Sequence, residues 1–211
     1  MNIIPTDIPE VLIIEPQVFG DERGWFLESW QRERYLAAGL PAGLVQDNQA
    51  YSRHGVLRGL HIQHPHAQGK LVQVLRGEVF DVAVDVRPGS PWFGHWVGLL
   101  LSGENHRQFW VPPGFAHGYY VTGEDALFSY KCTDFYHPEN ELSVAWNDPA
   151  IGIDWPLRGE PTLSAKDQIG LTLAEIPAAR LPAYGVYCSD PIPMPSSILD
   201  PLTAGPLIAR P

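Results

Sequence analysis

The sequence predicts an all-β protein: an antiparallel β-barrel or jelly roll with a few short helices. Short segments rich in valine, isoleucine and aromatic residues recur along the chain, and clusters of glycine, proline, asparagine and aspartate separate them. In the segment 78–86, Val82, Val84 and Val86 alternate with small or acidic residues, which is typical of a half-buried antiparallel strand. No helical pattern alternates with the strands, so a fold built from βαβ units is not expected.

The first part of the chain is expected to hold two strands and a short helix. Residues 11–19 (VLIIEPQVF) form a strand that Pro16 bends or confines to a sheet edge. Residues 25–30 form a second strand after a turn. Ser29 then caps a short helix that ends at Gly39, because serine is a preferred N-cap and glycine a preferred helix stop.

The middle of the chain holds the strongest strand signals. Residues 70–75 (KLVQVL) and 78–86 (EVFDVAVDV) are expected to form a hairpin with its turn at Gly77. The strand at 45–51 is unusually polar, so it faces either a ligand or, as an exposed edge strand, the solvent. Further strands are expected at 95–102, 107–111, 118–121, 126–133 and 141–146.

Composition indicates one folded domain in residues 1–176, followed by a proline-rich arm or tail in residues 177–211. The chain of 211 residues is 45% hydrophobic and 18% charged, as ordinary globular proteins are. The last 35 residues contain eight prolines. A net charge of -10 gives no general attraction for nucleic acid or acidic membranes, so neither is an expected partner.

Cysteine usage and the N-terminus bear on the cellular compartment. Cys132 and Cys188 form neither a disulfide framework nor a metal-ligand pair, and Cys132 is interpreted as a small buried residue. The N-terminus lacks the pattern of a signal peptide, and no apolar run reaches the roughly 20 residues that cross a bilayer. The sequence therefore predicts a cytoplasmic protein with reduced thiols.

Two histidines fall in a pattern that resembles the metal-binding motif of cupin barrels. Gly59 and Gly77 frame His64 and His66 at nearly the spacing of that motif. Lys70, however, occupies the place of the acidic ligand, and an ammonium group cannot ligate a cation. We therefore expect no metal here.

A second half of the cupin pattern, P-x-G-x2-H, occurs at residues 112–117 and ends in His117. Val121 stands where that pattern has an asparagine. The cupin-like barrel remains the predicted fold. A metal-dependent oxygenase or isomerase that uses His64, His66 and His117 remains a rival interpretation.

Several short motifs occur together in one order. They are 21–24 (DERG), 56–61 (VLRGLH), 68–72 (QGKLV), 114–118 (GFAHG), 130–131 (YK), 146–148 (WND) and 163–167 (LSAKD). In these motifs the chain resembles the dTDP-4-dehydrorhamnose 3,5-epimerases, a cofactor-free family with a cupin-like barrel, over roughly residues 1–175. Ile62 departs from the aromatic residue expected after the histidine, and the tail beyond Pro177 is longer than expected.

The resemblance implies an epimerase that inverts C3, C5 or both in a dTDP-4-keto-6-deoxy sugar, en route to dTDP-L-rhamnose or a related deoxysugar. Both carbons neighbour the C4 carbonyl, so inversion needs a base, an acid on the opposite face and a group that stabilises the enolate. No cofactor is needed, and the chain has no glycine-rich dinucleotide motif. The resemblance also implies a homodimer in which N-terminal strands of one subunit complete the other's sheet.

The resemblance assigns the chemistry to a few side chains. His61 acts as the base, because a neutral imidazole accepts a proton readily, and Tyr130 delivers a proton from the opposite face. Lys70 places its ammonium at the C4 oxygen, where negative charge develops. Asp167 orients His61, although Ser164 three residues earlier offers it a helix-capping role instead.

Other matched residues are expected to bind the substrate. Arg23, Arg58 and Lys166 supply positive charge for the diphosphate, as the local basic cluster that an acidic chain requires. A barrel that binds a nucleotide sugar without turnover is the third interpretation. The remaining contacts are Glu28, Gln46 and Asn48 for the base or sugar, Tyr136 for stacking on thymine, His117 for the sugar or diphosphate, and Glu141 for holding other groups in place.

Overall fold

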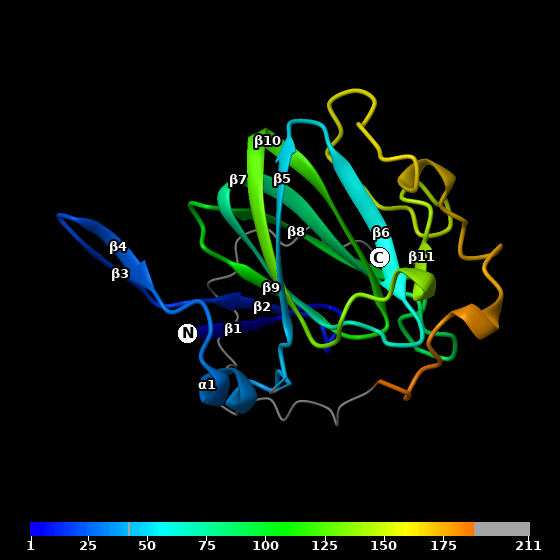
Figure 1. The fold of residues 1–211 in the computed structure, drawn as a ribbon, viewed down its shortest axis with the longest axis horizontal. Helices are drawn as coiled ribbons and strands as arrows, with labels where there is room; N and C mark the ends of the chain where they lie inside the picture. Colours follow the sequence, from blue (N-terminus) through cyan, green and yellow to red (C-terminus); the bar gives the residue numbers. More distant parts are fainter. Residues whose placement is uncertain (42, 188–211) are drawn as a thin grey trace.

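The computed structural model describes residues 1–41 and 43–187, which form an antiparallel β-barrel, as predicted (Figure 1). The strands of its main sheet are β1 (Asn2–Pro5), β2 (Leu12–Glu15), β5 (Gln46–Arg53), β6 (Leu57–Gln63), β7 (Lys70–Asp85), β8 (Trp96–Ser102), β9 (Gln108–Val111), β10 (Phe115–Cys132) and β11 (Glu141–Ser143). They follow the order β1-β2-β9-β7-β10-β6-β11, with β5 beside β10 and β8 beside β7.

The helices are short, and one of them begins later than the sequence predicts. Helix α1 (Arg32–Ala37) is capped by the side chain of Gln31, which accepts a hydrogen bond from the Arg34 amide. The prediction that Ser29 caps this helix is wrong, because the helix begins at Arg32 and Gln31 is its cap. The backbone carbonyl of Ser29 instead accepts hydrogen bonds from the Tyr35 hydroxyl and from the side-chain amide of Gln108 in β9. The 3-10 helices are η1 (Pro138–Asn140), η2 (Asp167–Ile169) and η3 (Ala178–Arg180).

Two long strands, β7 and β10, give the barrel its shape. The start of β7 pairs with β9 and its later part with β8, while β10 pairs first with β6 and then with β5. Each long strand therefore belongs to both halves of the barrel and bends between them. The predicted strands 118–121 and 126–133 are two parts of β10, whose register shifts between Val121 and Ala126.

The predicted hairpin at Gly77 is also wrong, because Gly77 bends one continuous strand of 16 residues. Its φ is +79°, and a Cβ at this position would lie 1.8 Å from the carbonyl oxygen of Asp125 in β10. Only glycine tolerates both the left-handed backbone and this close approach. A glycine that bends a strand and a glycine that closes a hairpin give the same local sequence signal.

Both faces of β7 are buried, which corrects the prediction of a half-buried strand. Val82 and Val84 pack in one hydrophobic cluster, while Val79 lies in the cluster on the other face. The acidic positions between them, Asp81 and Asp85, are 0% exposed. Their carboxylates are bonded by polar side chains, Asp85 by Arg87 two positions later and Asp81 by His117 of β10, so they can be buried without facing solvent.

A two-stranded hairpin, β3 (Val18–Asp21) and β4 (Gly24–Leu27), projects from the barrel (Figure 1). Within the described residues its strands pair only with each other. Phe19, Trp25 and Phe26 on this hairpin are 59%, 60% and 67% exposed. Large aromatic side chains left in solvent on a projecting element mark a surface that binds another molecule.

The segment after Pro177 was expected to lie outside the core fold, but residues 177–187 contact the barrel. Leu181 is buried in a hydrophobic cluster, and the ring of Tyr184 lies 5.1 Å from the Arg87 guanidinium. The rest of the predicted arm, with Cys188, lies outside the described residues. Within the part that is described, no helix is long and apolar enough to span a bilayer.

Candidate active site

The neighbouring strands β6 and β10 bring His61 to the centre of the candidate site. In their register His61 pairs with His117. Gly59 allows the two strands to approach, since a Cβ there would lie 2.6 Å from the Cα of Gly118. His61 Nε2 lies 2.6 Å from Oδ1 of Asp167, a contact that spans 106 positions of the chain.

The Asp167 carboxylate contacts both His61 and Ser164, but it does not cap the helix, because η2 begins at Asp167 and its N-cap residue, Lys166, has no side-chain capping hydrogen bond. Its Oδ1 contacts His61, while its Oδ2 accepts a hydrogen bond of 2.6 Å from the Ser164 hydroxyl. The Asp167 amide in turn donates to Ser164 Oγ at 3.2 Å, at the start of η2. Burial alone would raise the pKa of Asp167, but the hydrogen bonds from His61 and Ser164 outweigh it and lower that pKa. The lowered pKa favours the ionised form of this buried carboxylate beside the imidazole.

Lys70 lies at the first position of β7, opposite Cys132 of β10, and Cys132 is also opposite Gln46 of β5. Cys132 is 0% exposed, so the prediction of a small buried residue is confirmed. Burial of the Lys70 ammonium lowers its pKa, although the carboxylates of Glu141 and Asp81 favour the charged form. Lys70 thus places a desolvated amino group at the end of the barrel where β5, β7 and β10 meet.

Tyr130 lies two positions before Cys132 and is opposite Val72 and Asn48 in the neighbouring strands. Its ring packs against the hydrophobic cluster that contains Phe128. Burial, assisted by Cys132, raises the pKa of Tyr130 to about 12. Its hydroxyl group therefore keeps its proton throughout the neutral range and is able to donate it.

Electrostatic interactions tie these groups to one region. The charge of Glu141 acts on both Lys70 and Tyr130, and His61 acts on Glu141. Glu141 also accepts hydrogen bonds from the Lys166 ammonium at 2.7 Å and from the Tyr136 hydroxyl at 3.0 Å. His61, Lys70 and Tyr130 therefore lie within electrostatic range of Glu141, whose direct hydrogen-bond partners are Lys166 and Tyr136.

The polar strand β5 adds amide groups to the same network. Gln46 Nε2 donates to Asn48 Oδ1 at 3.0 Å, and Gln46 Oε1 accepts from the Tyr136 amide at 3.0 Å. Asn48 Nδ2 lies 3.7 Å from Cys132 Sγ. The Tyr136 side chain is half exposed, which leaves its ring open to a ligand.

Sequence reasoning missed the residues that orient Arg58. The Arg58 Nε donates to Ser52 Oγ at 3.1 Å, and Ser52 Oγ lies 3.3 Å from the Tyr119 hydroxyl. Ser52 and Tyr119 are both buried, and Tyr119 is opposite Arg58 in the register of β10 and β6. Tyr119 lies two positions after His117 in β10. The alternation of side chains along a strand could therefore have indicated Tyr119 from the sequence.

His117 forms a separate buried pair rather than a metal site. Its Nε2 lies 2.9 Å from Asp81 Oδ1, and the side chain is 9% exposed. His64 lies by Tyr187 and His66 by Asp134. Among the described residues, no group of metal-ligand side chains combines the rival set of His64, His66 and His117.

Arg23 and Glu28 are not brought to this site within one chain. Arg23 lies on the projecting hairpin and pairs with Asp21, while Glu28 pairs with Arg34 of α1 at 3.0 Å. The predicted basic cluster of Arg23, Arg58 and Lys166 is therefore not assembled by a single subunit. The motif at residues 21–24, on which the prediction for Arg23 rests, does not indicate whether Arg23 acts in the site of its own chain or in that of another.

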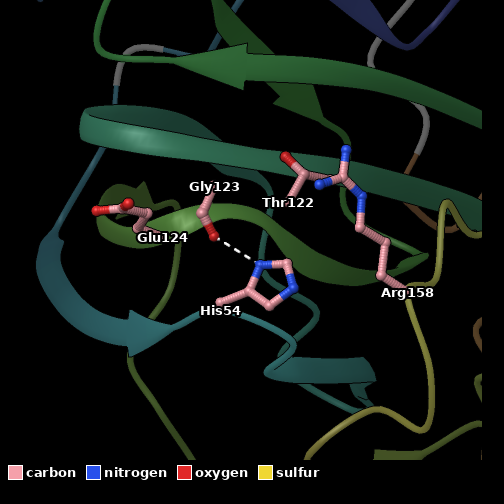
Figure 2. Close-up of a pocket in the computed structure, with 5 residues that line it drawn as sticks. All are labelled: His54, Thr122, Gly123, Glu124 and Arg158. Carbon is pink, nitrogen blue, oxygen red and sulfur yellow. Dashed lines mark hydrogen bonds between the residues drawn. The ribbon is translucent and has the colours of Figure 1, made fainter.

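A surface depression of about 590 Å³ lies elsewhere, at the turn between β5 and β6 (Figure 2). No residue predicted for the chemistry lines it. Its only hydrogen bond drawn in the figure joins His54 Nδ1 to the Gly123 carbonyl at 2.8 Å. Its lining residues are His54, Thr122, Gly123, Glu124 and Arg158.

Known proteins match the chain over nearly all of the barrel. The profile described as dTDP-4-dehydrorhamnose 3,5-epimerase matches residues 5–175. The dTDP-4-dehydrorhamnose 3,5-epimerase of Pseudomonas aeruginosa is 57% identical over 169 residues, which cover 80% of this chain and 93% of that protein. The dTDP-4-dehydrorhamnose 3-epimerase of Streptomyces niveus is 39% identical over 206 residues, covering 95% of this chain and 99% of the relative.

A solved structure agrees with these sequence matches. The chain is similar to the crystal structure of dTDP-6-deoxy-D-glucose-3,5-epimerase from Legionella pneumophila in complex with dTDP-4-keto-L-rhamnose, with a TM-score of 0.85 and 58% identity. The match covers 87% of this chain and 98% of that one. On the profile, the relatives and the fold together, this chain belongs to the dTDP-4-dehydrorhamnose 3,5-epimerase family.

Proposed function

We propose that this enzyme inverts C3 and C5 of a dTDP-4-keto-6-deoxy-hexose by removing and returning protons next to the 4-keto group. The observation that carries the proposal is the 2.6 Å contact between His61 and a buried, ionised Asp167, in the region that also holds Lys70 and Tyr130. Inversion at both carbons is favoured because the relatives at 57% and 58% identity are 3,5-epimerases. Inversion at one carbon is the alternative, supported by the 3-epimerase at 39% identity.

Proton removal begins at His61. The imidazole takes the proton from the carbon next to the ketone, and the electron pair of the C–H bond moves to form the enolate with its charge on the C4 oxygen. The imidazolium that forms is stabilised by the Asp167 carboxylate. The Lys70 ammonium stabilises the enolate oxygen, and its desolvation strengthens that interaction.

Proton return comes from the opposite face of the sugar. Tyr130 donates its hydroxyl proton to the carbon, which inverts the centre, and the enolate electrons re-form the ketone. With a pKa of about 12, Tyr130 enters each cycle protonated. His61 then gives its proton to solvent and Tyr130 regains one, so the enzyme returns to its starting state without a redox cofactor.

Substrate binding is assigned to the polar network around Glu141. Lys166 and Arg58 provide positive charge for the diphosphate. Gln46 and Asn48 offer amide groups to the base or sugar, and the half-exposed ring of Tyr136 offers a stacking surface for thymine. His117, which is buried beside Asp81, is assigned to bind the sugar or the diphosphate.

We propose a homodimer in which the hairpin of β3 and β4 carries Arg23, and the following segment Glu28, to the active site of the partner. The exposed aromatic residues of the hairpin support it, because Trp25 and Phe26 have more than half of their surface in solvent in the single chain. The absence of Arg23 from the chain's own site also supports it. The predicted cytoplasmic location stays a prediction, in agreement with the free thiol of Cys132.

Deuterium exchange tests the proposed reaction. The protein is incubated with dTDP-4-keto-6-deoxy-glucose in deuterated water, and deuterium at C3 and C5 is followed by NMR and mass spectrometry. We expect incorporation at both carbons in the wild type and in His54→Ala, a surface control, and its loss in His61→Ala. Incorporation at one carbon identifies a single-centre epimerase, and none at either carbon refutes the substrate assignment.

Subunit mixing tests the dimer. Arg23→Ala and His61→Ala chains are each expected to be nearly inactive alone. In a mixed dimer, one site combines an intact His61 with an intact Arg23 from the partner, so random mixing restores about a quarter of the wild-type sites. No recovery after mixing, or a light-scattering mass equal to one chain, contradicts the arrangement.

A further inference from the structure

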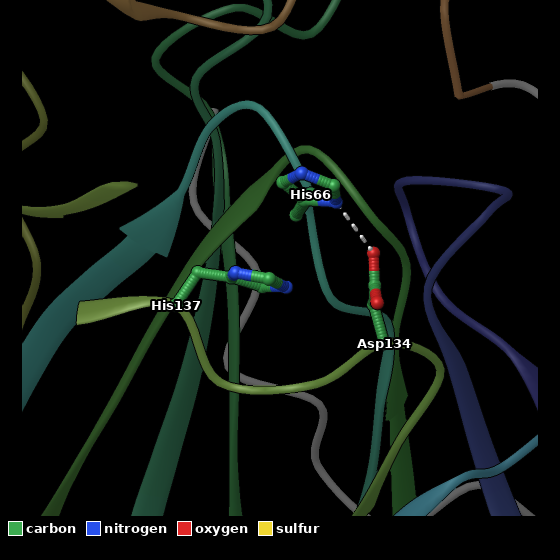
Figure 3. A group of neighbouring side chains, drawn as sticks. All are labelled: His66, Asp134 and His137. Atoms are coloured by element: carbon green, nitrogen blue, oxygen red, sulfur yellow. Dashed lines mark hydrogen bonds and ion pairs between the residues drawn. The ribbon is translucent and has the colours of Figure 1, made fainter. Parts of the chain in front are cut away.

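One cluster of metal-ligand side chains lies outside the proposed reaction centre, among the described residues (Figure 3). One ligand atom each from His66, Asp134 and His137 falls within 4.8 Å of the others. His66 lies between β6 and β7, and the other two lie between β10 and η1. We propose that these three residues bind one divalent transition-metal ion of the Zn²⁺, Ni²⁺ or Cu²⁺ class.

The spacing of the ligand atoms is near what such an ion requires. A tetrahedral ion with bonds of about 2.0 to 2.1 Å holds its ligand atoms about 3.3 Å apart. His66 Nδ1 and Asp134 Oδ2 are already 3.3 Å apart. The His66 and His137 rings are stacked, with centroids 4.2 Å apart and planes inclined by 18°. Rotation about the Cβ–Cγ bonds therefore brings one nitrogen of each ring toward a common point.

The surroundings leave room for that rotation but fix the backbone. The side chains of His66 and His137 are 49% and 31% exposed, so no packed core holds the rings. Their backbones are held by one buried side chain, Gln63, which donates to the His66 carbonyl and accepts from the His137 amide at 2.7 Å. Gln68, also buried, donates to the Asp134 carbonyl at 2.8 Å. Because the backbones are pre-ordered, closing the ligands on an ion loses little further chain entropy.

An outer carboxylate completes the arrangement. Glu139 Oε1 lies 3.3 Å from His137 Nδ1, which leaves Nε2 of the same ring for the ion. Carboxylates that bond the far nitrogen of a ligating histidine orient the ring and make it a stronger donor. Two imidazoles with a single carboxylate favour zinc, nickel or copper over magnesium or calcium, which prefer oxygen ligands.

The cluster is separate from the proposed chemistry, although it adjoins it. It uses none of the residues assigned to proton transfer, and only His66 belongs to the cupin-like pattern of the sequence. His137 directly follows Tyr136, whose amide bonds Gln46. The metal site is measured without nucleotide sugar, so its outcome is independent of the epimerase assay.

Calorimetric titration of the full chain with Zn²⁺ and Ni²⁺ tests the proposal. We expect saturable binding of one ion per chain, no binding of Mg²⁺, loss of binding in His66→Gln and His137→Gln, and binding about tenfold weaker in Glu139→Gln. His95→Gln replaces an exposed histidine outside the cluster and is expected to bind as the wild type does. Equal binding by the wild type and His137→Gln, or no saturable binding, overturns the proposal.

A spectroscopic measurement keeps the test independent of how well the variants fold. Electron paramagnetic resonance of one equivalent of Cu²⁺ bound to the wild type is expected to show coupling to two nitrogen donors, and each histidine variant is expected to lose this two-nitrogen signal. Thermal unfolding without metal shows that the variants are folded. A copper spectrum without two nitrogen donors in the wild type overturns the assignment.

Discussion

His61 and His117 face each other across β6 and β10, and each contacts an aspartate, yet the two pairs differ in access and in bonding. The His61 side chain is 25% exposed, and its partner Asp167 is also bonded by Ser164. The His117 side chain is 9% exposed, and no described residue bonds Oδ2 of Asp81. A histidine and an aspartate thus form a solvent-accessible pair at His61 and a buried pair at His117.

The pKa values of the two carboxyl groups are shifted in opposite directions. Asp167 is 4% exposed and Asp81 is 0% exposed. Hydrogen bonds outweigh desolvation at Asp167 and lower its pKa, whereas desolvation outweighs the contribution of His117 at Asp81 and raises its pKa. The deeper burial of Asp81 and the additional hydrogen-bond donors around Asp167 therefore act in the same direction, and together they favour the ionised form at Asp167 over that at Asp81.

The largest expected effect comes from breaking the accessible pair. His61→Asn removes the proton acceptor, so we expect kcat to fall by about 10² to 10⁴ with the thermal midpoint near that of the wild type. His117→Asn leaves the buried Asp81 without its ring donor, so we expect a lower thermal midpoint and a higher KM with a smaller loss of kcat. Steady-state kinetics and calorimetry measure both. The comparison fails if His117→Asn abolishes turnover while His61→Asn keeps it.

The next largest effect concerns the acid opposite the accessible pair. In Tyr130→Phe the base still removes a proton, but no group returns one to the other face. We expect inversion to slow by about 10² while deuterium exchange with retention continues, so the ratio of exchange to inversion rises. The measurement compares deuterium content with product configuration by NMR. An equal decrease of exchange and inversion would instead place Tyr130 at the proton-removal step.

The pH dependence separates the two groups that could limit activity in alkali. Burial lowers the pKa of Lys70 from its ordinary 10.5, whereas that of Tyr130 is raised to about 12. As pH rises, Lys70 therefore loses its proton first, and activity should decline below pH 10.5 while Tyr130 is still protonated. Lys70→Arg, whose guanidinium stays charged, is expected to be slower but to lose activity at higher pH. A decline at the same pH in this variant contradicts the assignment to Lys70.

The sequence predicted the fold class well, because strand composition and turn signals are local. It placed turns at Gly77 and between 121 and 126, where the structure has bends in long strands, since the partners that keep β7 and β10 continuous are far away in the chain. It predicted a half-buried strand at 78–86, because the partner that allows Asp81 to be buried, His117, is 36 positions away. Burial and pairing of polar residues depend on such distant contacts.

The candidate site shows the same limit. The family resemblance implied that Asp167 orients His61, but their spacing of 106 positions gave no geometry. The capping role of Asp167 and its contact with His61 were alternatives from the sequence, and the structure shows the contact with His61 together with a hydrogen bond from the Ser164 hydroxyl, but no side-chain cap at the start of η2. Arg23 lies on a projecting hairpin, and a sequence motif does not indicate whether its residues act within one subunit or across two.

The smallest expected effect is on stability, and its sign differs between the two carboxylates. The lowered pKa of Asp167 means that its ionised form stabilises the fold above the ordinary value of 3.8, and that this stabilisation is lost as pH falls through the folded-state pKa. Asp167→Asn is therefore expected to lower the free energy of unfolding at pH 7 by about 1.5 to 3 kcal/mol, the scale of hydrogen bonds to a charged group.

Asp81 is expected to behave in the opposite sense. Burial disfavours the ionised form of Asp81 and so raises its pKa. The contribution of Asp81 to the free energy of unfolding is therefore fully present below 3.8 and is lost as pH rises through the folded-state pKa. Asp81→Asn, a neutral replacement of the same shape, is expected to be at least as stable as the wild type at pH 7. Denaturant unfolding of both variants and the wild type between pH 7 and pH 3 should show two differences of opposite sign: that of Asp81→Asn shrinks as the pH falls toward 3.8, whereas that of Asp167→Asn shrinks only below 3.8. A loss of stability in Asp81→Asn as large as that in Asp167→Asn would mean that His117 holds Asp81 ionised, and that the two pairs differ in access alone.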